Sequence, residues 1–166
     1  MAGSPLMLPG WGADFLNELG YMWPKSDEVK MFDLGSAWVG FGSQASATHG
    51  RTTSPFQSVT SQNKGQDVDA FSGQFSHPDR GPTVLRDGSQ GATLIGPALF
   101  VAAGLVLALK ITVIVQLTLL VIQIAEAIAA AVATFGASLL WIPVAKKLCG
   151  LAINFALSKV IEALLG

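Results

Sequence analysis

The stretch Gly88–Ala145, GSQGATLIGPALFVAAGLVLALKITVIVQLTLLVIQIAEAIAAAVATFGASLLWIPVA, decides which fold this chain can adopt. Lys110 and Glu126 are its only charged residues. Between Leu105 and Phe135 it contains neither Gly nor Pro, so no residue there favours a turn. At 1.5 Å per residue, these positions predict one helical rod of about 45 Å.

Such a rod needs an apolar environment. A helix that is apolar on all sides is typical of the centre of a bundle, where neighbouring helices cover it. An uncharged apolar run of about 18 residues is also typical of a membrane span. The rod is longer than a hydrocarbon core of about 30 Å and offers no turn for two passes. We therefore favour a rod covered by protein, with a long tilted span, or an element that exchanges between both states, as the alternatives.

Charge and cysteine content exclude several classes of protein. The net charge is -1, with 10 basic and 11 acidic residues, and neither half carries the basic stripe that nucleic-acid binding needs. Cys149 is the only cysteine, which excludes an internal disulfide framework and the usual zinc spacings. The first 20 residues contain no Lys or Arg, so they do not predict a secretory signal peptide. If the protein leaves the cytoplasm, we expect another route.

The front of the chain predicts a lead and then a helical hairpin. Residues 1–25 form the lead, with a short helix over Trp11–Leu19 that ends at Gly20. Ser26 is placed to cap the next helix. Apolar residues then recur at helical spacing and predict one seam: Met31, Leu34, Trp38 and Phe41. Pro55 is expected to kink or break this helix.

A turn and a returning helix complete the predicted hairpin, which covers residues 26–82. Asn63-Lys64-Gly65 is a turn signal, and Asp67 can cap a second, shorter helix. Phe71 and Phe75 keep the helical spacing on it. Residues 83–166 then form long apolar helices, the last from about Leu139 to Leu164. The expected fold class is therefore all-α, a hairpin followed by an elongated bundle.

The order of several short motifs resembles a known family. They are Trp23-Pro24, Asp27-Glu28, Ala37-Trp38, Asn63-Lys64-Gly65, Asp69-Ala70-Phe71 and Gly136-Ala137-Ser138. In this order they resemble the WXG-like domains at the N-termini of actinobacterial polymorphic toxins that use type VII secretion. They are also similar to the outer membrane channel protein CpnT-like N-terminal domain. The resemblance spans nearly the whole chain.

The chain departs from the family pattern at the turn and at the export signal. Asn63 stands where the family's turn usually has Trp, while a literal Trp-x-Gly at Trp38-Val39-Gly40 lies inside the first predicted helix. The family's export signature is a Tyr followed four residues later by an acid. Tyr21 is the only tyrosine, and Lys25 occupies that later position. Export would then depend on a partner that carries the signal or on the surface of a heterodimer.

The resemblance implies a non-enzymatic export or delivery module that pairs with a small WXG-like helical-hairpin protein and meets the secretion machinery. It also implies a location outside the cell or in its envelope, reached without a signal peptide. The expected partner-binding residues are Trp23, Met31, Leu34, Trp38, Phe41, Phe71 and Phe75. For Met31, Leu34 and Phe41, packing against the chain's own rod is an equal alternative. Trp23 and Trp38 favour a partner, since such aromatics are enriched at interfaces.

The alternative function is a pore-forming protein or membrane anchor that inserts residues 92–165. Lys110 and Glu126 would then form a polar track, because charged groups inside a bilayer need partners. Lys146 and Lys147 would anchor the last helix at the headgroups, although a pair of lysines is more often a solvated face.

No catalytic, cofactor-binding or metal-binding arrangement is visible in the sequence. His49 and His77 stand in polar stretches. Neither is accompanied by Cys or carboxylate residues in an arrangement typical of a catalytic or metal site. Asp67 and Asp69 would lie on different faces of a helix. We therefore expect no enzyme and no cofactor.

Overall fold

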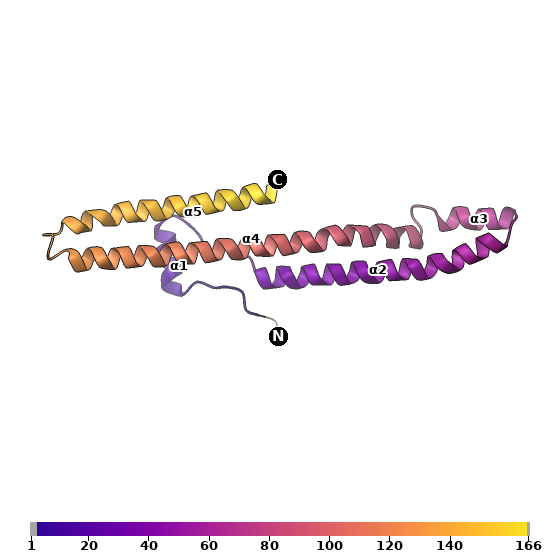
Figure 1. Cartoon of the computed structure of the whole chain (residues 1–166), viewed down its shortest axis with the longest axis horizontal. Helices are drawn as coiled ribbons and strands as arrows, with labels where there is room; N and C mark the ends of the chain where they lie inside the picture. Colours follow the sequence, from indigo (N-terminus) through magenta and orange to yellow (C-terminus); the bar gives the residue numbers. More distant parts are fainter. Residues whose placement is uncertain (1–2, 166) are drawn as a thin grey trace. The chain divides into compact units, whose positions relative to one another are not determined.

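The computed structural model describes residues 3–165, and these residues form helices joined by short connections, with no strand among them. The helices are α1 (Gly10–Glu18), α2 (Glu28–Gln62), α3 (Gln66–Phe75), α4 (Gly81–Ala130), the 3-10 turn η1 (Ala137–Leu140) and α5 (Trp141–Leu165) (Figure 1). The expected all-α fold is confirmed. The predicted rod is present from Leu105 to Ala130, as the second part of a 50-residue helix, and it ends before Phe135.

The chain divides into two compact units. The first unit combines the described residues up to Val29 with those from Ala102 onward, and the second unit comprises Lys30–Val101. This division differs from the three consecutive segments expected from the sequence. The reason is α4, which begins in the second unit and continues without a break into the first.

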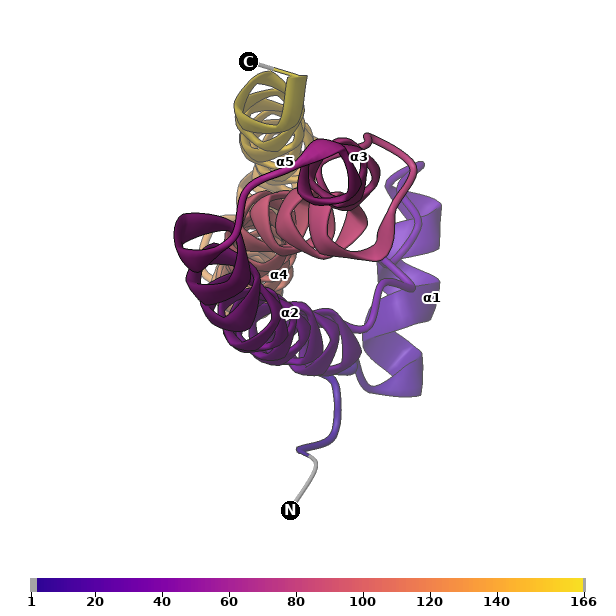
Figure 2. The ribbon, with the colours of Figure 1, turned by 90° about the vertical axis from the view of Figure 1, so that its right-hand side faces the viewer.

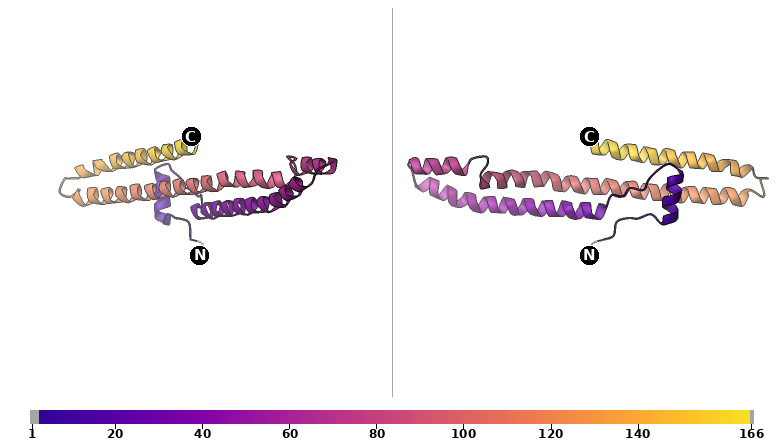
Figure 3. Two further views of the ribbon diagram at one scale, coloured as in Figure 1. Left: turned by 45° about the vertical axis from the view of Figure 1, so that its right-hand side comes forward. Right: turned by 180° about the vertical axis from the view of Figure 1, so that it is seen from behind.

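In the second unit, α2 and the first part of α4 lie side by side and run antiparallel (Figures 1 and 3). The register runs from Phe32 beside Phe100 to His49, whose ring contacts the carbonyl oxygen of Pro82. The returning arm of the hairpin is thus α4, and the short α3 that the sequence suggested for this role packs on the end of α2 instead. The reason is length: α3 has 10 residues, too few to cover the 35 residues of α2.

Pro55 lies inside α2 and does not break it, contrary to the expectation. The hydroxyl groups of the residues before it donate hydrogen bonds to the carbonyls of the preceding turn. Thr53 Oγ1 donates to His49 O at 2.8 Å, and Ser54 Oγ donates to Gly50 O at 3.1 Å. Such bonds engage the backbone near a proline and bend a helix gently. Figure 1 shows α2 curving toward its C-terminal end.

In the first unit, the rest of α4 and α5 form a second antiparallel hairpin, and α1 runs across their direction (Figures 1 and 2). Side chains from the three helices form one buried core: Leu16, Leu109, Val113, Leu117, Leu120, Ala145, Cys149 and Ile153. On α4 and on α5 these residues recur at three- and four-residue steps, so each helix presents one stripe to the other. Tyr21 Oη also donates a hydrogen bond to Gly150 O, at 2.9 Å.

A glycine at positive φ follows α1, and another precedes η1. Gly20 follows α1 with a φ of +84°, as expected for a helix that stops there. Gly136, at +86°, together with Phe135 at +50°, reverses the chain between α4 and α5. One helix start was placed wrongly from the sequence. α2 begins at Glu28, and the carbonyl oxygen of Ser26 accepts a hydrogen bond from Lys110 Nζ, at 2.7 Å.

Candidate functional site

The seam between α2 and α4 is built from small residues, whereas the sequence suggested a seam of large ones. On α2 the buried positions are Gly35, Gly42 and Ala45, and on α4 Ala92 is fully buried opposite them. A Cβ atom placed on Gly96 would lie 2.7 Å from Val39 and 3.1 Å from the carbonyl oxygen of Gly35. These contacts are close because neither glycine carries a side chain, which lets the two backbones approach each other.

The predicted seam is left open on another side of α2. Leu34, Ala37, Trp38 and Phe41 line an apolar pocket of about 320 Å³, and we call them the Trp38 face. Leu34 and Phe41 are each 50% exposed. The rings of Trp38 and Phe41 meet edge to face, with centroids 5.9 Å apart. The chain itself therefore does not bury these side chains, and Met31, one turn earlier, is only partly buried.

The two predicted partner residues on α3 pack against their own chain. Phe75 stacks on Phe56 of α2, with ring centroids 3.8 Å apart and an interplanar angle of 6°. Phe71 lies 5.5 Å from the Phe56 centroid and stays 46% exposed. These three rings fix α3 to α2, so a partner could reach only the exposed part of Phe71.

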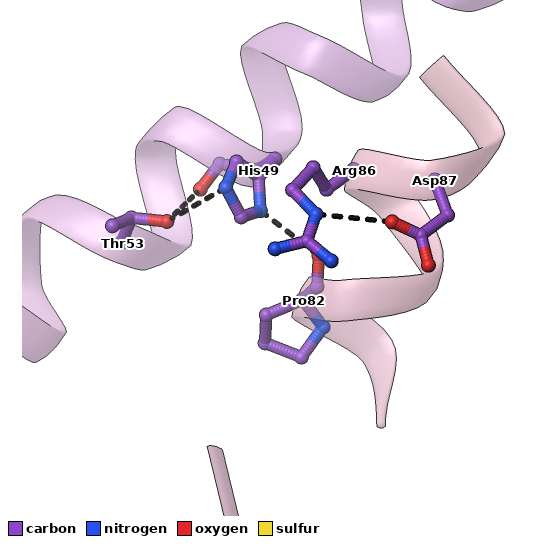
Figure 4. A network of polar contacts seen from close by, with 5 residues as sticks. All are labelled: His49, Thr53, Pro82, Arg86 and Asp87. Carbon is purple, nitrogen blue, oxygen red and sulfur yellow. Dashed lines mark hydrogen bonds and ion pairs between the residues drawn. The ribbon is translucent and has the colours of Figure 1, made fainter. Parts of the chain in front are cut away.

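A polar network next to this cluster links α2 to the start of α4 (Figure 4). His49 Nδ1 lies 2.9 Å from the carbonyl oxygen of Pro82 and therefore carries the proton of this hydrogen bond. Thr53 Oγ1 donates to His49 O, at 2.8 Å. Arg86 pairs with its neighbour Asp87, at 3.0 Å. Every one of these groups has a structural partner, so the network holds the hairpin register.

Trp23 lies inside the first unit, although the sequence favoured a partner contact for it. Its ring packs against the core of that unit, and Lys110 Nζ lies 5.8 Å from the ring centroid. The indole Nε1 is buried without a hydrogen-bond partner. We therefore leave Trp23 out of the candidate partner surface and assign it to the packing around Lys110.

Lys110 is buried among protein groups instead of forming a polar track with Glu126. Its side chain is 1% exposed and its Nζ lies 2.6 Å from Glu28 Oε2. The carbonyl oxygen of Ser26 accepts a second hydrogen bond from it. Sequence reasoning missed this pair. The available signal for a partner was Glu28, the acidic residue at the start of α2.

The surroundings of Glu28 favour its charged form. Burial alone would raise the pKa of this carboxyl, but hydrogen bonds from the Lys110 ammonium group and the Leu6 N–H outweigh that effect. The pKa of Glu28 therefore lies below its ordinary value. The pair is held as an ion pair at neutral pH.

The other three residues of the expected membrane set lie at the surface. Glu126 and Lys147 are exposed. Lys146 is partly exposed, lies 3.8 Å from Glu18, and places its Nζ 5.6 Å from the centre of the Phe15 ring. None of them enters the core of the first unit.

The first unit leaves much of its apolar surface uncovered. Both α4 and the segment Ala137–Leu165 are long and apolar enough to cross a membrane. Of their most apolar windows, 28% and 11% of the residues are buried, respectively. The expectation that helices cover the rear half is therefore met for the one stripe of the core, and much of the remaining apolar surface is exposed. Among residues 3–165, no three His, Cys, Asp or Glu side chains gather in a way that would hold a metal ion.

Comparison with known proteins gives one result. Residues 9–146 match the sequence model of a family described as WXG100 like domain. Neither the curated proteins nor the solved structures contain a match. The matched range covers most of the chain and includes α1, α2, α3, α4 and the start of α5. By this match the chain belongs to the WXG100-like domain family.

Proposed function

We propose that this chain is a non-enzymatic export module of a type VII secreted effector, and that it pairs through the Trp38 face with a small WXG-like helical-hairpin protein. Domains of this family typically pair with other helical-hairpin proteins in secretion systems. The observation that carries the proposal is the open Trp38 face on a hairpin whose seam between α2 and α4 is already filled.

The packing of α2 explains why a second hairpin fits there. Because α2 and α4 approach closely at Gly35, Gly42 and Ala92, the side chains of Leu34 and Phe41 remain half exposed beside their contact. A partner hairpin with a stripe of Leu, Met or aromatic residues would bury them in a four-helix arrangement. Trp38 would be its anchor, since Trp often carries much of the binding energy at an interface.

The closer assignment, to the N-terminal domain of a CpnT-like polymorphic toxin, is part of the same proposal. It rests on the order of the motifs from Trp23-Pro24 to Gly136-Ala137-Ser138. On this proposal the protein reaches the cell envelope or the medium without a signal peptide, and the export signal comes from the partner or from the joint surface.

Co-purification tests the pairing. The chain is expressed with the hairpin protein encoded next to it, as wild type, as Phe41→Asp and as Val59→Asp. Phe41 belongs to the Trp38 face, whereas Val59 lies on the same helix, has a similar exposure of 47%, and does not line the pocket. We expect Phe41→Asp to abolish co-purification and Val59→Asp to keep it. Equal recovery of the partner with both variants, each with a wild-type circular dichroism spectrum, would overturn the assignment of the Trp38 face.

We also propose membrane association through the first unit as a second function, in the form of an anchor or a pore. The low burial of the apolar α5 favours it. Flotation of the purified chain with phosphatidylcholine vesicles tests this second proposal. Protein that stays at the bottom of the gradient at every lipid concentration would exclude it.

A further inference from the structure

The turn between α4 and α5 exposes large apolar side chains at a chain reversal. We define the hairpin tip as residues 131–141. Val132 is 89% exposed, Phe135 is 100% exposed and Leu140 is 76% exposed. The positive φ of Phe135 belongs to the reversal itself. The largest apolar side chains of the tip therefore face outward instead of closing over the turn.

Several polar groups of the same turn are paired within it. Gly136 N donates to Ala131 O at 2.8 Å, and Thr134 Oγ1 donates to Ala130 O at 2.9 Å. Ser138 Oγ donates to Ala127 O, at 2.7 Å. In lipid every backbone polar group needs an internal partner, because no water is present to replace it. These bonds give part of the turn the internal partners that such an environment requires.

Charges flank the hairpin tip on both helices and limit how much of it can enter lipid. The residues between Glu126 on α4 and Lys146 on α5 are all uncharged. From Trp141 to Lys147 the helix rises about 10 Å at 1.5 Å per residue. One leaflet contributes about 15 Å of hydrocarbon, half of the usual core. With Trp141 near the headgroups, Lys147 therefore stays outside the hydrocarbon, and entry deeper by one leaflet would carry Glu126 and Lys147 into the core, where charges are strongly disfavoured.

We propose that the hairpin tip inserts into a single leaflet of a lipid bilayer, with Phe135 deepest and Trp141 near the headgroups. Trp is enriched at that level because its ring is apolar and its N–H is polar. At the base of the tip Lys146 and Lys147 are offset by Glu126 and by Glu18, which lies 3.8 Å from Lys146. The base carries no net charge, so a zwitterionic surface suffices and anionic lipid adds little. This inference rests on the proposed membrane association and narrows it to one entry point.

Flotation with phosphatidylcholine vesicles compares wild type with Phe135→Asp and Phe155→Asp. Both changes replace an exposed Phe of the same hairpin by Asp, and Phe155 is 66% exposed but lies on α5, away from the tip. Asp tolerates positive φ better than most residues, so Phe135→Asp does not strain the turn. We expect Phe135→Asp to lower the vesicle-bound fraction by at least about tenfold and Phe155→Asp to leave it unchanged, at equal helicity.

Depth and lipid charge give independent readouts. Brominated lipids should quench wild-type tryptophan fluorescence in the vesicles, and Trp141→Phe should remove this quenching while it keeps vesicle binding. Vesicles with added anionic lipid should bind the wild type no more than about twofold better.

The outcomes separate this inference from the broader proposal. Equal loss of binding in Phe135→Asp and Phe155→Asp, or quenching that survives Trp141→Phe, would overturn tip insertion and leave membrane association standing. Vesicle binding by Phe135→Asp at the wild-type level would also overturn tip insertion and leave membrane association standing. Absence of any binding by the wild type would overturn both.

Discussion

Lys110 Nζ lies 2.6 Å from Glu28 Oε2, although 82 residues separate the two in the chain. Both side chains are buried, at 1% and 8% exposure. Because a charge left alone in such a place is strongly destabilising, this pair fixes the start of α2 to the middle of α4 within the first unit.

The first prediction is that the contributions of Glu28 and Lys110 to the free energy of unfolding are coupled. Glu28→Gln and Lys110→Met should each lower the free energy of unfolding by about 3 to 5 kcal/mol, because each leaves a buried charge without its partner. The double variant should lose less than the sum of the two, which denaturant unfolding of all four proteins measures. Lys159→Met is the control, since Lys159 and Glu162 are also 2.7 Å apart but exposed, and about 1 kcal/mol or less is expected. Strictly additive losses at Glu28 and Lys110 would contradict the coupling.

The second prediction concerns the stability of the folded chain at low pH. The pKa of Glu28 is lower in the folded chain than its ordinary value of 4.5, so the unfolded chain binds a proton more readily at this site. The stabilisation is therefore complete above about pH 4.5 and is lost as the pH falls through the folded pKa. Unfolding of wild type and Glu28→Gln between pH 7 and pH 3 measures it. Their difference in stability should shrink only below about pH 4.5, and a constant difference across this range would refute the linkage.

The third prediction concerns the glycine seam of α2 and α4. Gly35→Ala should destabilise by about 1 to 3 kcal/mol, because its new Cβ would lie 2.7 Å from the Phe100 ring and 3.0 Å from the carbonyl oxygen of Gly96. Gly40→Ala lies on the same helix with nothing within 4 Å, so it should be neutral or stabilise by up to about 1 kcal/mol. Thermal unfolding followed by circular dichroism compares them. Similar melting temperatures for the two variants would show that the close approach does not exist in solution.

The fourth prediction ranks the aromatic side chains that hold α3. Phe75→Ala removes the ring stacked on Phe56 and should cost about 2 kcal/mol, whereas Phe71→Ala removes a ring that is 46% exposed and should cost about 1 kcal/mol. Proteolysis at the Asn63-Lys64-Gly65 connection measures how often α3 detaches. The reverse order of sensitivity would mean that Phe71 is the main contact.

The sequence predicted the helices well where one residue type decides the outcome. Gly20 ends α1, the stretch without Gly or Pro after Leu105 is helical as far as Ala130, and the last helix ends close to Leu164. Pro55 misled because it removes one backbone hydrogen bond from a helix of 35 residues, and the helix continues on both sides of it.

The packing seam could not be predicted in the same way. Periodicity identified Leu34, Trp38 and Phe41 as the apolar side of α2, and they are indeed contiguous. It could not show that Gly35 and Gly42, one step around the helix, are the ones that face α4. Glycines carry no hydrophobic signal, so a seam that works by close backbone approach is invisible to a search for large apolar residues.

The partner of Lys110 was hidden for a different reason. A lone lysine in an apolar helix shows that compensation is needed, but the compensating carboxylate comes from the far end of the sequence. Only the fold brings Glu28 to it.

The close approach of Gly35 to Gly96 also affects the width of the pair formed by α2 and α4. Helices that meet through leucines stand farther apart than helices that meet through glycines, so this pair is slim for its length. Any pore that transports the folded pair has to be at least as wide as the pair. The close approach at Gly35 and Gly96 helps to set that width.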